Sequence, residues 1–78
     1  MNFPESLGFT LNDITDEYEK KVVDGKLLIW KNINNYSWTL EYEDPDEYVY
    51  TYRVGSESDI EKGLKSYWRD KRLNELLN

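Results

Sequence analysis

The feature that most constrains this chain is an alternation of large apolar and polar residues through residues 36–54. The large residues occupy every second position on both sides of an acidic run at 43–47: Tyr36, Trp38, Leu40 and Tyr42 before it, and Tyr48, Tyr50, Tyr52 and Val54 after it. A period of two is typical of strands with one buried face. The pattern predicts a β-hairpin with its loop at 43–47, in a register that pairs these residues as follows: Tyr42 with Tyr48, Leu40 with Tyr50, and Trp38 with Tyr52.

Residues 26–33 predict a preceding strand that is apolar on both faces. Two asparagines follow at 34–35, and asparagine tolerates the positive φ of a tight turn. A two-residue turn there pairs Ile29 with Leu40. The apolar face then continues from this strand into the 36–54 hairpin, and the agreement between two independently chosen turns supports one sheet.

Residues 12–23 allow two interpretations. As a helix they form one apolar face that ends before Gly25, a typical residue after a helix C-terminus. As a strand, residues 17–23 lead into Asp24 and Gly25, which together favour a two-residue hairpin turn. The strand has one flaw, because it places the charged Lys20 on the apolar face.

The first eleven residues predict an irregular lead-in. Pro4 is suited to open a single helical turn, and Gly8 is suited to close it. The apolar residues of this segment are the expected anchors onto the core: Phe3, Leu7, Phe9 and Leu11.

Residues 57–72 predict a C-terminal helix. Its start has two overlapping capping candidates, Ser58 with Glu61 and, more weakly, Ser56 with Asp59. One stripe should cover the aromatic face of the sheet, and it consists of Ile60, Leu64, Tyr67 and Trp68. Gly63 lies inside the helix and costs about 1 kcal/mol relative to alanine.

Residues 73–78 no longer follow that stripe. At about 100° per residue, three leucines of this segment point nearly opposite to the stripe; they are Leu73, Leu76 and Leu77. Either this end is turned or frayed and tucks back, or the leucines contact a partner.

These elements predict an α+β fold, with one domain over residues 1–78. An antiparallel meander of three or four strands within 17–54 carries one C-terminal helix on one face. If 12–23 is helical, the order becomes α-β-β-β-α, which is similar to a double-stranded-RNA-binding domain. That family has a lysine cluster at the start of its second helix, whereas this chain has Ser-Glu-Ser-Asp at 56–59. The resemblance therefore concerns topology and does not imply RNA binding.

Composition excludes several kinds of chemistry. The 78 residues contain no cysteine and no histidine, which excludes disulfides, thiolate chemistry, imidazole bases and the usual zinc sites. The sequence has no glycine-rich phosphate loop or nucleophile elbow, so we expect no enzyme activity, no cofactor and no metal. The N-terminus lacks the features of a signal peptide, and no run is long enough to span a bilayer, so we expect a cytoplasmic protein with no membrane partner.

Charge is unevenly distributed along the chain. The net charge is −6, which argues against direct contact with nucleic acid. Residues 1–61 carry fourteen acidic and five basic residues, whereas residues 62–78 carry two acidic and five basic residues. The acidic candidates for partner binding are Glu41, Glu43, Asp44, Asp46 and Glu47 at the hairpin tip, together with Asp16, Glu17 and Glu19. The tip is either a solvated loop that protects a sheet edge or an interaction surface that imitates spaced phosphates.

A second candidate surface is apolar. One helix covers one face of a sheet, so the other face is expected to stay uncovered. Leu28, Trp30 and Val49 lie on that other face and would form an exposed partner site or dimer seam. The three leucines of residues 73–78 are further candidates for an apolar contact.

In size, acidity and lack of catalytic motifs, the chain resembles the small inhibitor proteins of phages and mobile elements, which include anti-CRISPR, anti-restriction and DNA-mimic proteins. This resemblance is compositional and assigns no residues. It implies a non-enzymatic protein-binding module that blocks a basic nucleic-acid-binding cleft on a partner enzyme. A structural or homo-oligomerising domain, such as a homodimer, and a toxin immunity protein are the alternatives.

Overall fold

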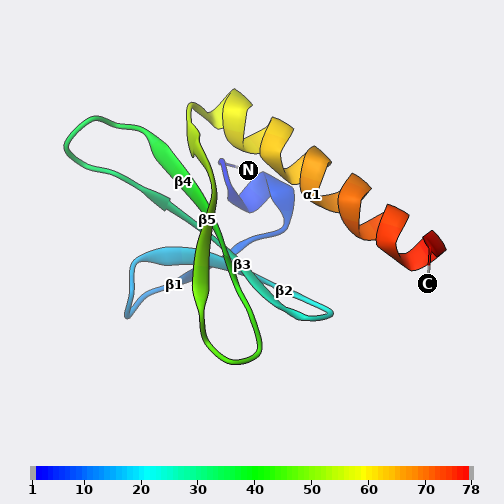
Figure 1. Ribbon diagram of the computed structural model, residues 1–78. Coiled ribbons are helices and arrows are strands. Elements are labelled where there is room, and N and C mark those ends of the chain that lie inside the picture. The colour runs from blue at the N-terminus through cyan, green and yellow to red at the C-terminus, as the bar shows by residue number, and fades with distance from the viewer. Residues whose placement is uncertain (1, 78) are drawn as a thin grey trace.

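A five-stranded antiparallel sheet crossed by one long helix makes up the fold (Figure 1). The structure, a computed structural model, describes residues 2–77 and the side chains of residues 2–72. The elements in chain order are η1 (Glu5–Leu7), β1 (Thr10–Asn12), β2 (Glu17–Val22), β3 (Gly25–Lys31), β4 (Trp38–Glu43), β5 (Val49–Gly55) and α1 (Glu57–Leu77). Each strand pairs with the next one along the chain, which confirms the predicted α+β meander with a C-terminal helix.

The N-terminal third is more regular than the sequence indicated. Residues 17–22 form a strand, so the strand interpretation of 12–23 is correct and the α-β-β-β-α order is not. Residues 10–12 form β1 and pair with β2, with Leu11 opposite Tyr18, although the lead-in through residue 11 was expected to be irregular. The predicted helical turn is present as η1. Leu11 is 40% exposed and is therefore no core anchor.

The β2–β3 hairpin turns one residue earlier than predicted. Val22 pairs with Gly25, so Val23 and Asp24 form the turn. Gly25 has φ 144°, and a Cβ there would collide with the backbone oxygen of Glu43 on β4. Gly25 is therefore needed where the turn passes β4 closely.

The β3–β4 register is the predicted one, although the turn is different. Ile29 pairs with Leu40 as expected. The connection is longer than the two asparagines, because the Asn32 amide donates to the Ser37 carbonyl at 2.7 Å and closes a larger loop. The positive φ belongs to Tyr36, and Ile33 at the tip is 82% exposed.

The predicted β4–β5 register is wrong. Tyr42 pairs with Tyr50 rather than with Tyr48, and Leu40 pairs with Arg53 across a bulge next to Glu41. The bulge reverses the alternation of β5, so the stem of Arg53 faces α1. Val54, expected on the buried face, is 55% exposed.

The cause of the shift is the loop between β4 and β5. Asp44 accepts hydrogen bonds at its Oδ1 from the amides of Asp46 and Tyr48, at 2.9 and 3.0 Å. The Asp44 amide in turn donates to the Tyr48 carbonyl at 2.9 Å. These bonds hold residues 44–48 as a closed loop, and strand pairing starts at Glu43 and Val49.

The helix starts at the weaker of the two capping candidates. The Ser56 amide donates to Asp59 Oδ2 at 2.9 Å, and the Asp59 amide donates back to Ser56 Oγ at 3.3 Å. These bonds are a reciprocal capping box. The hydrogen bonds from the Ser56 amide and hydroxyl hold the pKa of Asp59 below its usual value. At its other end α1 continues to Leu77, beyond the helix end expected at residue 72.

The core lies between α1 and the sheet. It consists of one side chain from the lead-in, three from β3 and β4, and two from α1: Phe9, Leu27, Ile29, Leu40, Ile60 and Leu64. Fully burying a side chain of this size contributes about 1.5–3 kcal/mol. Phe3 and Leu7 pack against this cluster, as expected, together with Tyr67. The predicted helix stripe therefore covers the sheet, although Trp68 remains 39% exposed.

Candidate functional site

The sheet face turned away from α1 is the candidate site. Successive residues of a strand point to opposite faces, so the neighbours of core residues Leu27 and Ile29 point away from the helix. On β3 those neighbours are Leu28 and Trp30, and on β4 they include Glu41. No helix in the described part of the chain covers this face, which agrees with the expectation of one uncovered face.

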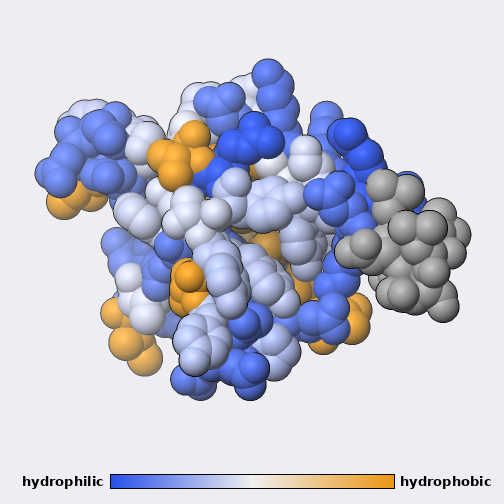
Figure 2. Space-filling view, in the orientation of Figure 1, coloured by the Kyte–Doolittle hydropathy of each residue, from blue (hydrophilic) through white to orange (hydrophobic). Residues whose placement is uncertain are grey.

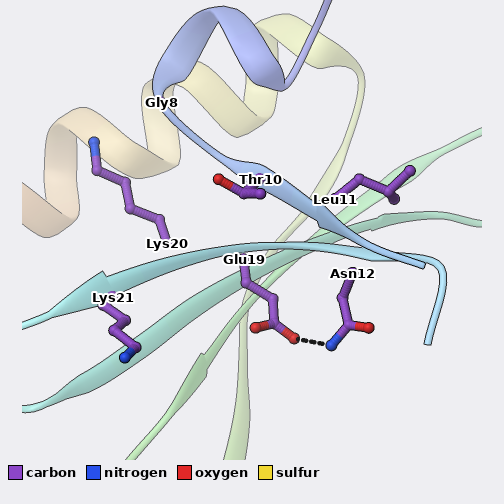
Figure 3. A pocket seen from close by; sticks show the side chains of 7 residues that line it. All are labelled: Gly8, Thr10, Leu11, Asn12, Glu19, Lys20 and Lys21. Atoms are coloured by element: carbon purple, nitrogen blue, oxygen red, sulfur yellow. Dashed lines mark hydrogen bonds between the residues drawn. The ribbon is translucent and has the colours of Figure 1, made fainter. Parts of the chain in front are cut away.

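Four carboxylates lie on this face, and we call them the acidic face: Glu17, Glu19, Glu41 and Glu43. Leu28 sits between Glu19 on one neighbouring strand and Glu41 on the other. Lys26 reaches two of the four, with its Nζ 3.6 Å from Glu19 Oε1 and 3.6 Å from Glu43 Oε2. Asn12 of β1 donates to Glu19 Oε2 at 2.9 Å (Figure 3). The acidic face thus spans β2 to β4 and keeps an excess of negative charge.

The carboxylates influence each other. Partial burial raises the pKa of Glu17 above its usual value, and the negative charges of Glu41, Glu19 and Glu43 raise it further. Lys26 opposes this effect. A positive charge that approached this face would stabilise ionised Glu17 by offsetting the repulsion from its neighbouring carboxylates.

The sequence predicted an exposed apolar patch of Leu28, Trp30 and Val49 on this face. The prediction is wrong for Leu28. That side chain is only 5% exposed and lies in line with Glu19 and Glu41. Trp30 is half-buried, and its indole N–H donates to Glu41 Oε1 at 2.9 Å. Val49 is exposed, as expected. The apolar surface that this face exposes is therefore limited to part of Trp30 and to Val49.

The structure separates the other acidic candidates. Asp44 is a structural residue, since its carboxylate accepts two backbone hydrogen bonds and one from the Tyr50 hydroxyl. Asp46 and Glu47 are exposed at the tip of the β4–β5 loop. Asp16 lies in the turn between β1 and β2, at the opposite end of the sheet. The eight acidic candidates do not form one cluster. The acidic face lies between the end of the sheet with Asp16 and the end with the β4–β5 loop.

One basic residue in the last third of α1, Lys71, makes a structural contact. Lys71 Nζ lies 3.2 Å from Asp24 Oδ2 in the β2–β3 turn and donates to the Tyr67 hydroxyl at 3.3 Å. Burial acts to lower the pKa of Lys71, but the hydrogen bonds with Asp24 and Tyr67 outweigh it and raise the pKa. The side chains of Leu73, Leu76 and Leu77 lie outside the described residues, so the apolar contact predicted for them stays a prediction.

Lys20 and Trp68 form a feature that was not identified as a site from the sequence. Lys20 points to the α1 side of β2, whereas Glu19 and Lys21 point to the other side (Figure 3). Its Nζ lies 5.7 Å from the centre of the Trp68 ring. The available signal was the charged residue on an otherwise apolar strand face.

Elsewhere the visible surface is mostly hydrophilic, with hydrophobic residues as separate spots (Figure 2). Among residues 2–77, no helix is both long and apolar enough to cross a membrane. The same part of the chain has no group of three acidic side chains arranged to hold a metal ion. Comparison with models of protein families, with curated proteins and with solved structures gives no match.

Proposed function

We propose that this protein is a non-enzymatic binding module whose acidic face docks onto a basic surface of a partner protein. The uncovered sheet face carries the proposal, because its carboxylates lie on the same face as the half-buried Trp30, whose indole N–H bonds to one of them. Charge complementarity with a basic partner would guide association and orientation.

The partner we propose is an enzyme that binds nucleic acid, with this protein as its inhibitor. A cleft that binds nucleic acid presents lysine and arginine side chains to phosphates. Carboxylates fixed on neighbouring strands offer such a cleft negative charges in a rigid array. The net charge of −6 and the resemblance to inhibitors of phages and mobile elements support the same partner class.

The experiment is capture of partners from a lysate of the source cell, followed by assay of the captured enzyme. The test variant combines Glu17→Gln, Glu19→Gln and Glu41→Gln, which removes three of the four charges of the acidic face. Glutamine keeps a side-chain oxygen that can accept the hydrogen bonds from Asn12 and Trp30. A control variant removes the same number of charges outside the acidic face and the tip, at Glu5, Glu57 and Glu61.

The proposal predicts capture of a nucleic-acid-binding enzyme that high salt releases, because screening weakens such contacts. The wild type and the control variant should inhibit that enzyme, and the test variant should not. Equal inhibition by the test variant would contradict the proposal. Capture of a toxin instead would identify an immunity protein.

Self-association is a second candidate, favoured by the exposure of β5. In the described part of the chain β5 pairs only with β4 and is therefore an edge strand. Exposed apolar and aromatic side chains lie along it and before it: Tyr48, Val49, Tyr50 and Val54. Such an edge can pair with another strand. Sedimentation velocity over a wide concentration range tests this, and a monomer throughout would exclude it.

A further inference from the structure

A small groove on the α1 side of the molecule has a chemistry that the acidic face does not share. It lies between η1, β2 and α1 and has a volume of about 280 Å³. Its floor is apolar and is made by the buried side chains of Phe9 and Leu64. Trp68, partly exposed, forms one wall. A groove of this size accommodates a small organic molecule rather than a protein segment.

Lys20 brings a positive charge into this groove. It pairs with the fully buried Leu27 of β3 and occupies the strand face that also carries Tyr18 and Val22. Its Nζ lies 6.0 Å from the centre of the Phe9 ring and 5.7 Å from that of Trp68. Both separations are within cation–π range. A charged residue on an otherwise apolar strand face breaks the local pattern, and such breaks concentrate at functional sites.

The ammonium of Lys20 retains hydrogen-bonding capacity. It carries three donors, and one of them is used by the Leu7 carbonyl at 3.2 Å. Among the described residues, no carboxylate lies within ion-pair distance of it. Gly8 leaves room beside it, since a Cβ at Gly8 would lie 3.1 Å from Lys20 Nζ. A half-buried cation in this position gains most from an anionic partner.

The rim of the groove strengthens this preference for an anion. Lys65 adds a second positive charge, and Glu61 adds one negative charge. The balance at the groove is positive, although the chain as a whole is acidic. The site therefore combines an apolar floor, an aromatic wall and a positive end.

We propose that this groove binds a small organic carboxylate with an aromatic or branched-aliphatic body. The carboxylate would accept hydrogen bonds from Lys20, and the body would lie on Phe9 and Leu64 beside Trp68. This site is independent of the acidic face, so the proposed function can fail without affecting it.

The test is a titration with 4-phenylbutyrate, followed by NMR of the tryptophan indole N–H signals. The chain has three tryptophans, and a Trp68→Phe variant identifies the signal of Trp68. We expect a saturable shift of that signal with a millimolar Kd, the range for a ligand of this size. The neutral 4-phenylbutyramide has nearly the same shape, and we expect it to bind at least about tenfold more weakly because it lacks the charge.

Two matched variants separate the roles of charge and packing. Lys20→Met should weaken phenylbutyrate binding at least about tenfold, and Lys21→Met, which removes the same charge from the other face, should leave it unchanged. If Lys20→Met does not fold, Lys65→Met at the exposed rim replaces it, with an expected loss of about threefold. Absence of a saturable Trp68 shift, equal binding of the amide, or equal effects at Lys20 and Lys21 would each overturn the proposal.

Discussion

Gly63 of α1 packs directly against Arg53 of β5. A Cβ on Gly63 would lie 3.1 Å from the Cβ of Arg53 and 3.3 Å from Cδ2 of Leu40. Because the Arg53 Cβ is fixed to the strand backbone, it cannot move aside as the end of a long side chain can. The glycine therefore sets how closely the helix approaches the sheet, at the point where the β5 bulge turns Arg53 towards α1.

Gly63→Ala should consequently destabilise the protein. Alanine favours the helix by about 1 kcal/mol, whereas overpacking of a tight contact costs about 1–3 kcal/mol. We expect a net loss of about 1 kcal/mol in the free energy of unfolding, measured by urea denaturation. A gain in stability would show that α1 and β5 separate easily.

Ser56→Ala should lower stability by about 1 kcal/mol, since Ser56 caps α1 through Asp59. Ser58→Ala is the matched control and should have little effect, because Ser58 is an exposed residue inside the first turn. Thermal unfolding followed by circular dichroism compares the two. The opposite order would favour the Ser58–Glu61 capping box.

Lys71→Met should loosen the contact between α1 and the β2–β3 turn. It removes the ion pair with Asp24 and the hydrogen bond to Tyr67, and we expect a loss of about 1 kcal/mol. Arg72→Met removes an equal charge from an exposed neighbour and should be close to neutral. Chemical denaturation at low and high salt checks both variants, and the loss should shrink at high salt.

Glu17→Gln should stabilise the protein at neutral pH. The pKa of Glu17 is raised in the folded state, so its stabilising contribution is present below its ordinary value of 4.5 and is lost as pH rises through the folded-state pKa. The gain at pH 7 should be less than about 1 kcal/mol, because water screens partly exposed charges, and it should disappear in acid. Melting temperatures across this pH range, with Glu47→Gln as control, provide the measurement; an undiminished gain in acid would contradict it.

Asp44→Ala should disorder the β4–β5 loop, whereas Asp46→Ala should not. Asp44 Oδ1 accepts two backbone hydrogen bonds and its Oδ2 accepts the Tyr50 hydroxyl at 3.3 Å, so its loss should cost about 1–2 kcal/mol. Amide hydrogen exchange of Asp46 and Tyr48 reports the loop directly. Unchanged protection in the Asp44 variant would show that the backbone alone closes the loop.

Alternation predicted the sheet well, because a period of two is a property of the residues themselves. It predicted that Leu27 and Ile29 share one face with Leu40, and they form the core. It could not predict the β5 register. That register depends on the hydrogen bonds of the Asp44 side chain within the loop and on a bulge that inserts one residue before Arg53. Neither feature interrupts the alternation of large and polar residues in the sequence.

Only part of the candidate site could be predicted from the sequence, for a related reason. The carboxylates of β2 and β4 were identified, but their position together on one face depends on strand order. The sequence grouped them with Asp16, Asp46 and Glu47, which a sheet of this topology places at opposite ends. In the sequence Lys20 only weakened the strand prediction. The groove around it depends on η1 and α1 packing beside β2, which the sequence did not predict.

The strand order of the sheet also bears on the speed of folding. Each strand pairs with its immediate successor, and α1 packs mainly on β4 and β5, the two strands that precede it. Folding can therefore advance by closing short loops one after another, which is faster than assembling distant segments. The exceptions are contacts between α1 and the N-terminal part of the chain. They include the Lys71–Asp24 ion pair and the contact of Phe9 and Lys20 with Leu64 and Trp68, on which the groove depends. We expect these contacts to form last and to open first, so the groove would report on the final step of folding.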